Sequence, residues 1–197
     1  MKLIIALLLL APFAMANTFN IDTKASKVTW LGKKVSGKHN GSIGIKSGTV
    51  KVEKGMVKSG EFVIDMNAII VDDIKNPEWN KKLVDHLRSN DFFDSANHKE
   101  GKFVIKSVKK KGKMMEIAGD MTLRGKTNPE SIQADIKIDG KKATAKGKME
   151  IDRTKYGLKY SSGKFFDPKK LGDKMIYDKF EIGVEFTAMM ADKPKKK

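Results

Sequence analysis

The stretch KATAKGKMEID, Lys142–Asp152, alternates small or apolar residues with polar ones at every step. Because successive side chains of a β-strand point to opposite faces, this pattern predicts a strand with one dry face and one wet face. The dry face begins with small side chains, since Ala143, Ala145 and Gly147 precede its first large one. The stretch therefore predicts a β fold, and it leaves open which side chains fill the interior of that fold.

The same alternation recurs along most of the chain. Glycine-containing turn signals at Lys54-Gly55, Lys111-Gly112 and Asp139-Gly140 separate several of the alternating stretches. Strands with one wet face are typical of antiparallel sheets, and a succession of them favours an all-β barrel or a two-sheet sandwich. Besides Lys142–Asp152, these stretches are residues 26–33, 61–68, 102–108, 116–124, 131–139 and 179–188.

One segment between the predicted strands has helical spacing instead. Asn76 is a suitable helix cap and Pro77 suits the first helical position, so we predict one short helix over residues 77–89. Its apolar residues recur every four positions and should form a stripe over the sheet or across one of its ends. The stripe consists of Trp79, Leu83 and Leu87. A second irregular segment, a long polar loop, is expected at residues 157–175.

The first sixteen residues, MKLIIALLLLAPFAMA, have the features of a secretory signal. One cation precedes a short apolar run, and Ala14-Met15-Ala16 is a small-x-small cleavage site. We therefore expect cleavage after Ala16, a periplasmic or secreted protein, and one barrel domain over residues 17–191. The remaining basic tail, residues 192–197, is predicted to be disordered.

The chain is strongly basic, with a formal net charge of +16, and all but three of its 40 cations are lysine. Arginine is the residue that reads guanine and phosphate by paired hydrogen bonds, so this composition argues against a nucleic-acid partner. Lysines spread along strands are typical of a solvated outer face, which also favours anionic membrane surfaces. The chain contains no cysteine, which excludes disulfides and thiol chemistry.

The inward rows of the predicted strands leave two alternatives open, a hollow barrel and a solid one. Small residues leave volume unfilled unless large residues face them, and methionine adapts to variable apolar shapes. Inward-facing rows that combine small residues with methionine favour a cavity for one small ligand, which a barrel of about eight strands can hold. The small residues are Gly119, Ala134, Ala143, Ala145 and Gly147, and the methionines are Met66, Met121 and Met149.

Catalytic signatures are weak. The histidines His39, His86 and His98 lack a recognised metal-ligand spacing, and Ser161-Ser162-Gly163 lacks the flanking glycine of a nucleophile elbow. We therefore predict no enzyme, no catalytic residue, no metal and no cofactor. A hydrolase is the least favoured alternative, after a solid-core barrel that meets anionic partners through its lysines.

Several segments together resemble the YceI-like family. They are VTWLGKKVSGKHNGSIGIKSGTV (28–50), HLRSNDFFD (86–94), GDMTLRGKT (119–127), EIDRTKYGL (150–158) and YDKFEIGVEF (177–186). The resemblance covers nearly the whole chain after residue 16. It implies an antiparallel lipocalin-like barrel that carries or stores a long isoprenoid, a quinone or a similar amphiphilic lipid, and it makes a homodimer plausible.

Residues of the ligand site are assigned on this basis. Two phenylalanine pairs, Phe92-Phe93 and Phe165-Phe166, lie in polar surroundings. Neighbouring residues on a strand cannot both face inward, so one Phe92-Phe93 ring should cap the interior while the other packs under the helix. Phe165 and Phe166 should do the same from a mobile loop that acts as a lid. For both pairs the alternative is simple packing of the rings at a corner of the fold. The expected wall consists of Trp30, Phe62, Ile64, Met66, Phe103, Ile117, Met121, Leu123, Ile136, Met149 and Phe186, and the head-group candidates are His39, Arg153 and Tyr156.

Overall fold

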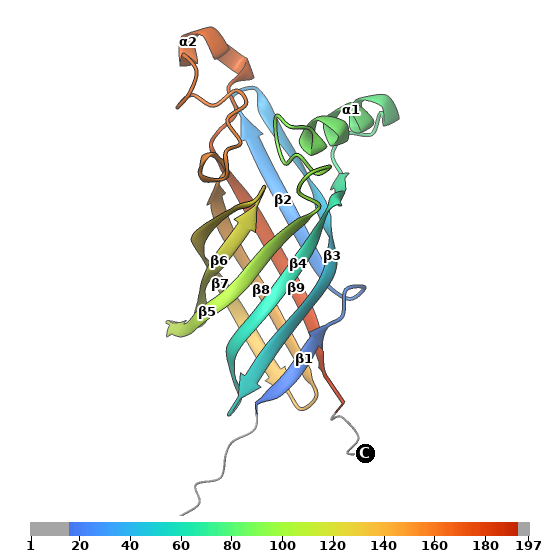
Figure 1. The fold of residues 1–197 in the computed structure, drawn as a ribbon, viewed down its shortest axis with the longest axis vertical. Coiled ribbons are helices and arrows are strands. Elements are labelled where there is room, and N and C mark those ends of the chain that lie inside the picture. Colours follow the sequence, from blue (N-terminus) through green and yellow to red (C-terminus); the bar gives the residue numbers. More distant parts are fainter. Residues whose placement is uncertain (1–15, 193–197) are drawn as a thin grey trace, which may run out of the picture.

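The computed structural model describes residues 16–192, which form one twisted antiparallel barrel with short helices at one end (Figure 1). The expectations for the signal segment, apart from Ala16, and for residues 193–197 lie outside the described residues. The strands are β1 (Asn17–Ile21), β2 (Lys27–Lys34), β3 (Gly37–Glu53), β4 (Met56–Val71), β5 (Glu100–Lys111), β6 (Met114–Leu123), β7 (Lys126–Asp139), β8 (Lys142–Asp152) and β9 (Lys179–Met190). The helices are α1 (Pro77–Arg88), η1 (Arg153–Tyr156), α2 (Pro168–Leu171) and η2 (Gly172–Lys174).

The sheet closes on itself, because β3 pairs with β4 as well as with β2. The nine strands occupy eight positions around the barrel, since β1 and β2 both lie between β3 and β9. Asn20 of β1 faces Thr49, and Val28 of β2 faces Ile43 further along the same strand. The predicted lipocalin-like antiparallel barrel of about eight strands is therefore confirmed.

Hairpin geometry explains how consecutive strands pair. Lys54 and Gly55 both have positive φ, at 51° and 73°. Two such residues in a row suit the right-handed twist of the flanking strands. Arg124 and Gly125, with φ of 49° and 69°, make an equivalent turn that ends β6 at Leu123. The sequence prediction that extended this strand through residue 124 was wrong at its boundary.

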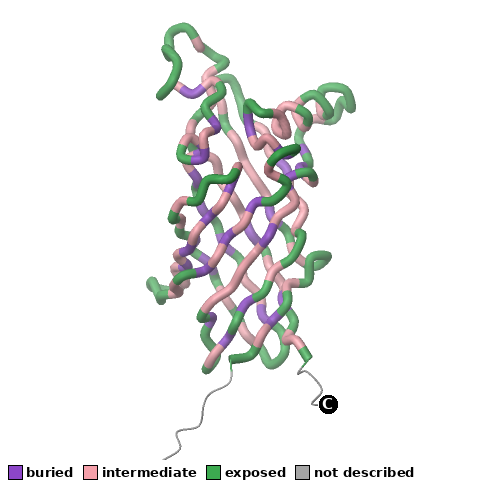
Figure 2. The backbone as a smooth tube through the Cα atoms, in the orientation of Figure 1, coloured by how far each residue is buried: buried purple, intermediate pink, exposed green. Residues whose placement is uncertain are grey.

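Strands β1 and β3 were not identified from alternation. The 17 residues of β3 mix glycine, serine and lysine, and the pairing of β3 with β4 shifts register at three points, beginning between Ile43 and Gly44. The second shift leaves Lys46 of β3 without a partner and thereby breaks the period of two in this strand, whereas the other two leave extra residues on β4. In the regular strands, buried and exposed positions alternate along the tube, as Figure 2 shows.

The predicted short helix is confirmed as α1. Its cap is Asn76, whose side chain accepts hydrogen bonds from the backbone N–H groups of Glu78 and Trp79. The expected stripe is only partly realised, because Trp79 is 61% exposed whereas Leu83 and Leu87 are half-buried. The helix lies beside one end of the barrel rather than over a sheet face (Figure 1), and Trp79 stays largely in solvent.

Gly119 provides a test of the inward packing. A β-carbon there would lie 2.4 Å from the Val104 carbonyl oxygen and 2.7 Å from the Phe103 ring. Since backbone must shift to relieve this overlap, Gly119→Ala should lower the free energy of unfolding by about 1 to 3 kcal/mol. The matched control is Gly32→Ala in β2, where a β-carbon meets nothing within 4 Å. Urea denaturation of both variants measures the difference, and equal midpoints would contradict this packing.

Candidate ligand cavity

The barrel encloses an apolar cavity of about 220 Å³. Its lining draws on all eight barrel positions and is dominated by aliphatic, aromatic and methionine side chains. An apolar cavity of about 150 Å³ is enough to hold a benzene-sized molecule, so this one has room for part of a hydrocarbon chain. The charged or hydroxyl-bearing lining residues are Lys33, Lys102, Thr144, Arg153 and Tyr177.

The interior is thus hollow rather than solid, but only some small residues account for this. Ala134, Ala143 and Ala145 line the cavity. By contrast, the space beside Gly119 is occupied by Phe103, and Gly147 lies against Ala134 and the backbone of β7. The three alanines therefore leave open volume beside them, whereas the two glycines allow neighbouring groups to pack closely.

All eleven expected wall residues line the cavity, and so do both residues of the pair Phe92-Phe93. These are Trp30, Phe62, Ile64, Met66, Phe92, Phe93, Phe103, Ile117, Met121, Leu123, Ile136, Met149 and Phe186. Alternation identified them because each of those on a strand lies on its dry face. Whether any of them contacts a ligand stays a prediction.

Within the lumen, the rings of Phe62 and Phe186 stack at a centroid distance of 4.7 Å, although their strands are not neighbours. This pair narrows the cavity where β1 gives way to β2.

The pair Phe92-Phe93 differs from expectation because both residues line the cavity. They lie in a turn after α1, not on a strand, so the rule of alternating faces does not apply. Phe92 packs edge-on against His86 at 4.9 Å, and Phe93 packs against Phe180 at 6.4 Å. The prediction that only one of the two faces inward was wrong.

The pair Phe165-Phe166 lies elsewhere. Both rings are largely exposed, at 46% and 51%, and neither lines the cavity. The structure therefore does not support a role for them as a lid that closes over the interior. They belong to the loop between β8 and β9, which lies at the end that also carries α1 (Figure 1).

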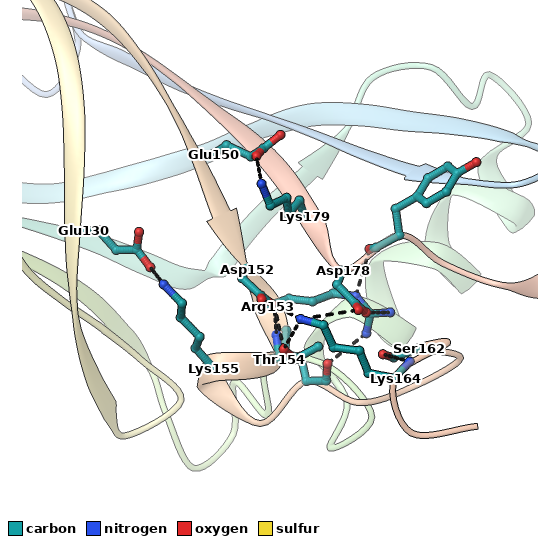
Figure 3. Close-up of polar contacts among 12 residues, drawn as sticks. Glu130, Glu150, Asp152, Arg153, Thr154, Lys155, Ser162, Lys164, Asp178 and Lys179 are labelled. Atoms are coloured by element: carbon teal, nitrogen blue, oxygen red, sulfur yellow. Dashed lines mark hydrogen bonds and ion pairs between the residues drawn. The ribbon is translucent and has the colours of Figure 1, made fainter. Parts of the chain in front are cut away.

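Arg153 holds the two legs of that loop together (Figure 3). Its side chain is only 4% exposed and donates from Nε to the Tyr177 carbonyl at 3.1 Å, and from Nη1 to the Leu158 carbonyl at 2.8 Å. Nη2 donates to the Ile176 carbonyl at 2.9 Å and lies 3.5 Å from Asp178. Burial lowers the pKa of Arg153, and the neighbouring carboxylates oppose that effect. Because its donors satisfy backbone carbonyls, the geometry disfavours a head-group role for Arg153.

A second polar contact fixes the start of the loop. Lys164 Nζ lies 2.8 Å from Asp152 Oδ2, and Asp152 also accepts hydrogen bonds from the backbone and hydroxyl of Thr154. Burial alone would raise the pKa of Asp152, but these donors outweigh it and lower the pKa to about 2. The same contact raises the pKa of Lys164.

The other head-group candidates do not line the cavity. His39 Nδ1 lies 2.8 Å from Asp73 Oδ2 near the turn between β2 and β3. Tyr156 is fully buried, and its hydroxyl donates to Glu130 Oε1 at 3.1 Å. Burial and the Glu130 carboxylate raise the pKa of Tyr156. In this structure both side chains tie neighbouring segments together.

Other lining residues were missed at the end that carries α1. Phe180 and Ile182 belong to an alternating stretch, so their dry-face positions were a usable signal. Leu158 and Ile176 come from the two legs of the β8–β9 loop, where no periodicity marks the inward side. Only the closed tertiary structure brings these two residues to the interior.

Two other kinds of feature are absent from residues 16–192. No three His, Asp or Glu side chains in this range lie together in a way that could hold a metal ion. Within the same range, no helix has the length and apolar character needed to cross a membrane.

A closed antiparallel barrel around an apolar cavity defines a class of small-molecule-binding β-barrels. Within that class, the YceI-like domain model matches residues 19–188, and this chain belongs to the YceI-like family.

Similarity to curated relatives is local. A UPF0312 protein of Photorhabdus laumondii is 41% identical over 56 residues, which are 28% of this chain and 29% of that protein. Protein YceI of Escherichia coli O157:H7 is 39% identical over 74 residues, which are 34% of this chain and 39% of that protein. The chain thus matches well under half the length of each relative.

Two solved structures share the fold. BcnA of Burkholderia cenocepacia has a TM-score of 0.66 at 19% identity, and the match covers 86% of this chain and 99% of BcnA. A polyisoprenoid binding domain from Saccharophagus degradans has a TM-score of 0.64 at 13% identity, over 88% and 98% of the two chains. At such identities the likeness establishes the barrel architecture.

The contacts of Arg153 predict a large local contribution to stability. Arg153→Met would leave buried carbonyls and Asp178 without their partner, so the free energy of unfolding should fall by about 3 to 5 kcal/mol. The loop at residues 157–175 should also become sensitive to protease. Lys179→Met, in which both the lysine and its partner Glu150 are more than half exposed, is the control and should behave like the wild type. A wild-type urea midpoint for Arg153→Met would contradict the proposed clamp.

Asp152 predicts an acid-dependent loss of stability. Its folded-state pKa of about 2 lies below the ordinary 3.8, so its contribution is present above about pH 4 and is lost as the pH falls towards 2. The contribution is at most about 2 kcal/mol. Asp152→Asn should therefore be less stable at pH 7 and should lose less stability between pH 4 and pH 2. Urea titrations at several pH values check this, with the exposed Glu150→Gln as control. Parallel curves for Asp152→Asn and wild type would refute it.

Proposed function

We propose that this protein binds a long-chain isoprenoid, a quinone or a similar amphiphilic lipid, with the hydrocarbon chain inside the barrel. The observation that carries the proposal is the apolar cavity itself, which draws on every barrel position. Membership of the YceI-like family supports it, as does the shared fold with a structure described as a polyisoprenoid binding domain. Non-catalytic carriage or storage requires no reacting group, which fits the absence of a recognised catalytic motif.

Hydrophobic transfer supplies the affinity in this proposal. Removing about 300 Å² of hydrocarbon surface from water is worth roughly 7 kcal/mol at about 25 cal/mol per Å², before the costs of ordering the chain. The methionines of the wall adapt to chains of different shape because their side chains are flexible and polarisable. The cavity therefore fits a class of apolar chains better than one rigid molecule.

The proposed setting is the periplasm or the outside of the cell, after removal of residues 1–16 as a signal. A homodimer is proposed as its oligomeric state. The signal-like composition of residues 1–16 supports the first proposal and the family resemblance supports the second. Cell fractionation and analytical ultracentrifugation test them separately.

Filling the cavity tests the binding proposal directly. Ala145 lines the cavity, so Ala145→Phe should abolish uptake of a fluorescent prenyl lipid or of ubiquinone while the barrel stays folded. The matched control is Ala118→Phe, the same change on the outer face of β6, which should bind like the wild type. Native mass spectrometry of the wild type should also show a co-purified apolar molecule. Equal uptake by both variants, or none by the wild type, would overturn the proposal.

A further inference from the structure

The adjacent rings of Phe165 and Phe166 are exposed without an evident structural reason. Each of them leaves about half of its surface in solvent, at 46% and 51%, although the pair Phe92-Phe93 lines the cavity nearby. Their backbone N–H groups both donate to the carbonyl of Ser162, at 3.0 Å. Ser162 is fully buried, so the turn that presents the rings is anchored to the barrel.

Cations surround the exposed rings. The loop at residues 157–175 contains five lysines and two aspartates. Lys159 Nζ lies 4.8 Å from the centre of the Phe165 ring. Of the two aspartates, Asp167 is occupied as the cap of α2, where its side chain accepts from the Lys169 backbone N–H. The tip therefore combines apolar rings with an excess of positive charge.

The base of this loop is firmly held. Arg153 bonds to carbonyls on both legs, and Lys164 is paired with Asp152. Lys164 directly precedes Phe165, so these contacts hold the segment that presents the two exposed rings. Rigid presentation lowers the ordering cost of any surface that binds it.

A second aromatic residue with a cation lies at the same end of the barrel. Trp79 of α1 is 61% exposed, and Lys82 Nζ lies 4.3 Å from the centre of its ring. Both α1 and α2 are found at this end, opposite the end where β1 begins and β9 finishes (Figure 1). The cavity also reaches this end, since Leu87 of α1 and Ile176 of the loop line it.

We propose that this end of the barrel docks on an anionic phospholipid bilayer, with Phe165 and Phe166 inserted at the interface and loop lysines on the lipid phosphates. Exposed phenylalanine rings gain from burial at the boundary between head groups and acyl chains, and lysines are attracted by anionic lipid. A protein partner would offer matched side chains for specific pairs, whereas these surroundings provide only unspecific apolar and cationic groups. Docking places the cavity next to the membrane from which a lipid would come.

Sedimentation with lipid vesicles tests the docking. The ligand-free protein from residue 17 onward, without the apolar signal-like segment, is mixed with vesicles of phosphatidylcholine containing about 30% phosphatidylglycerol. Phe165→Ser/Phe166→Ser should weaken binding at least about tenfold without unfolding, because both rings are exposed in the wild type. The matched control changes two equally exposed apolar residues at the opposite end, Met56→Ser/Met189→Ser, and should bind like the wild type.

Charge is tested in the same assay. Lys169→Gln/Lys170→Gln should weaken binding and reduce its dependence on salt, and vesicles of phosphatidylcholine alone should bind poorly. Wild-type binding by the double phenylalanine variant would overturn the proposal. So would a wild type that ignores anionic vesicles, or an equal loss in the Met56→Ser/Met189→Ser control.

The docking proposal goes beyond ligand binding, and its failure is distinguishable from failure of that function. When a prenyl lipid is supplied from ethanol without vesicles, Phe165→Ser/Phe166→Ser should take it up like the wild type. Loss of uptake in this variant would mean that the rings serve the cavity and would count against docking as their role. Normal uptake combined with lost vesicle binding is the expected result.

Discussion

Closure of the sheet between β3 and β4 is the constraint on which the cavity depends. Pairing runs around the complete ring, so each strand has a partner on both sides over at least part of its length. Backbone hydrogen bonds between the strands therefore hold the wall together, so side chains from opposite strands do not have to fill the whole lumen. An open sandwich of the same strands would need its two faces packed together. A closed barrel can keep an interior that is apolar and still partly empty.

The barrel end that carries α1 depends on polar contacts instead of strand pairing. Between β8 and β9 the chain leaves the sheet for residues 153–178, and Arg153 replaces the missing ladder with hydrogen bonds to carbonyls of both legs. The Lys164–Asp152 pair adds a second contact at the base. A buried guanidinium suits this task because it offers several donors in a fixed plane. The same residue that stabilises the loop also contributes to the cavity lining.

The sequence was informative wherever a strand was regular. Alternation in stretches such as that of β8 was enough to predict the barrel and to select wall residues such as Met149. It failed at β3, because a bulge and several glycines interrupt the period. The large aromatic side chain of Phe92 correctly suggested an inward position. The prediction that only one residue of the pair Phe92-Phe93 faces inward was wrong, because the two residues lie in a turn and not on a strand. The loop residues Leu158 and Ile176 could not be predicted, since their inward orientation depends on contacts between distant segments.

The placement of β9 has a consequence for how the chain folds. Residues Lys179–Met190 form the last strand, yet they pair with β8 and with both β1 and β2 from the other end of the sequence. During synthesis the ring cannot close until this strand has emerged, and until then the earlier strands keep unpaired backbone edges and an uncovered apolar face. Contacts between such distant segments make folding slow and leave the nascent chain prone to aggregation. A hollow barrel closed by its last strand is thus expected to fold slowly, and the risk of aggregation is greatest for the newly made chain, before any lipid is bound.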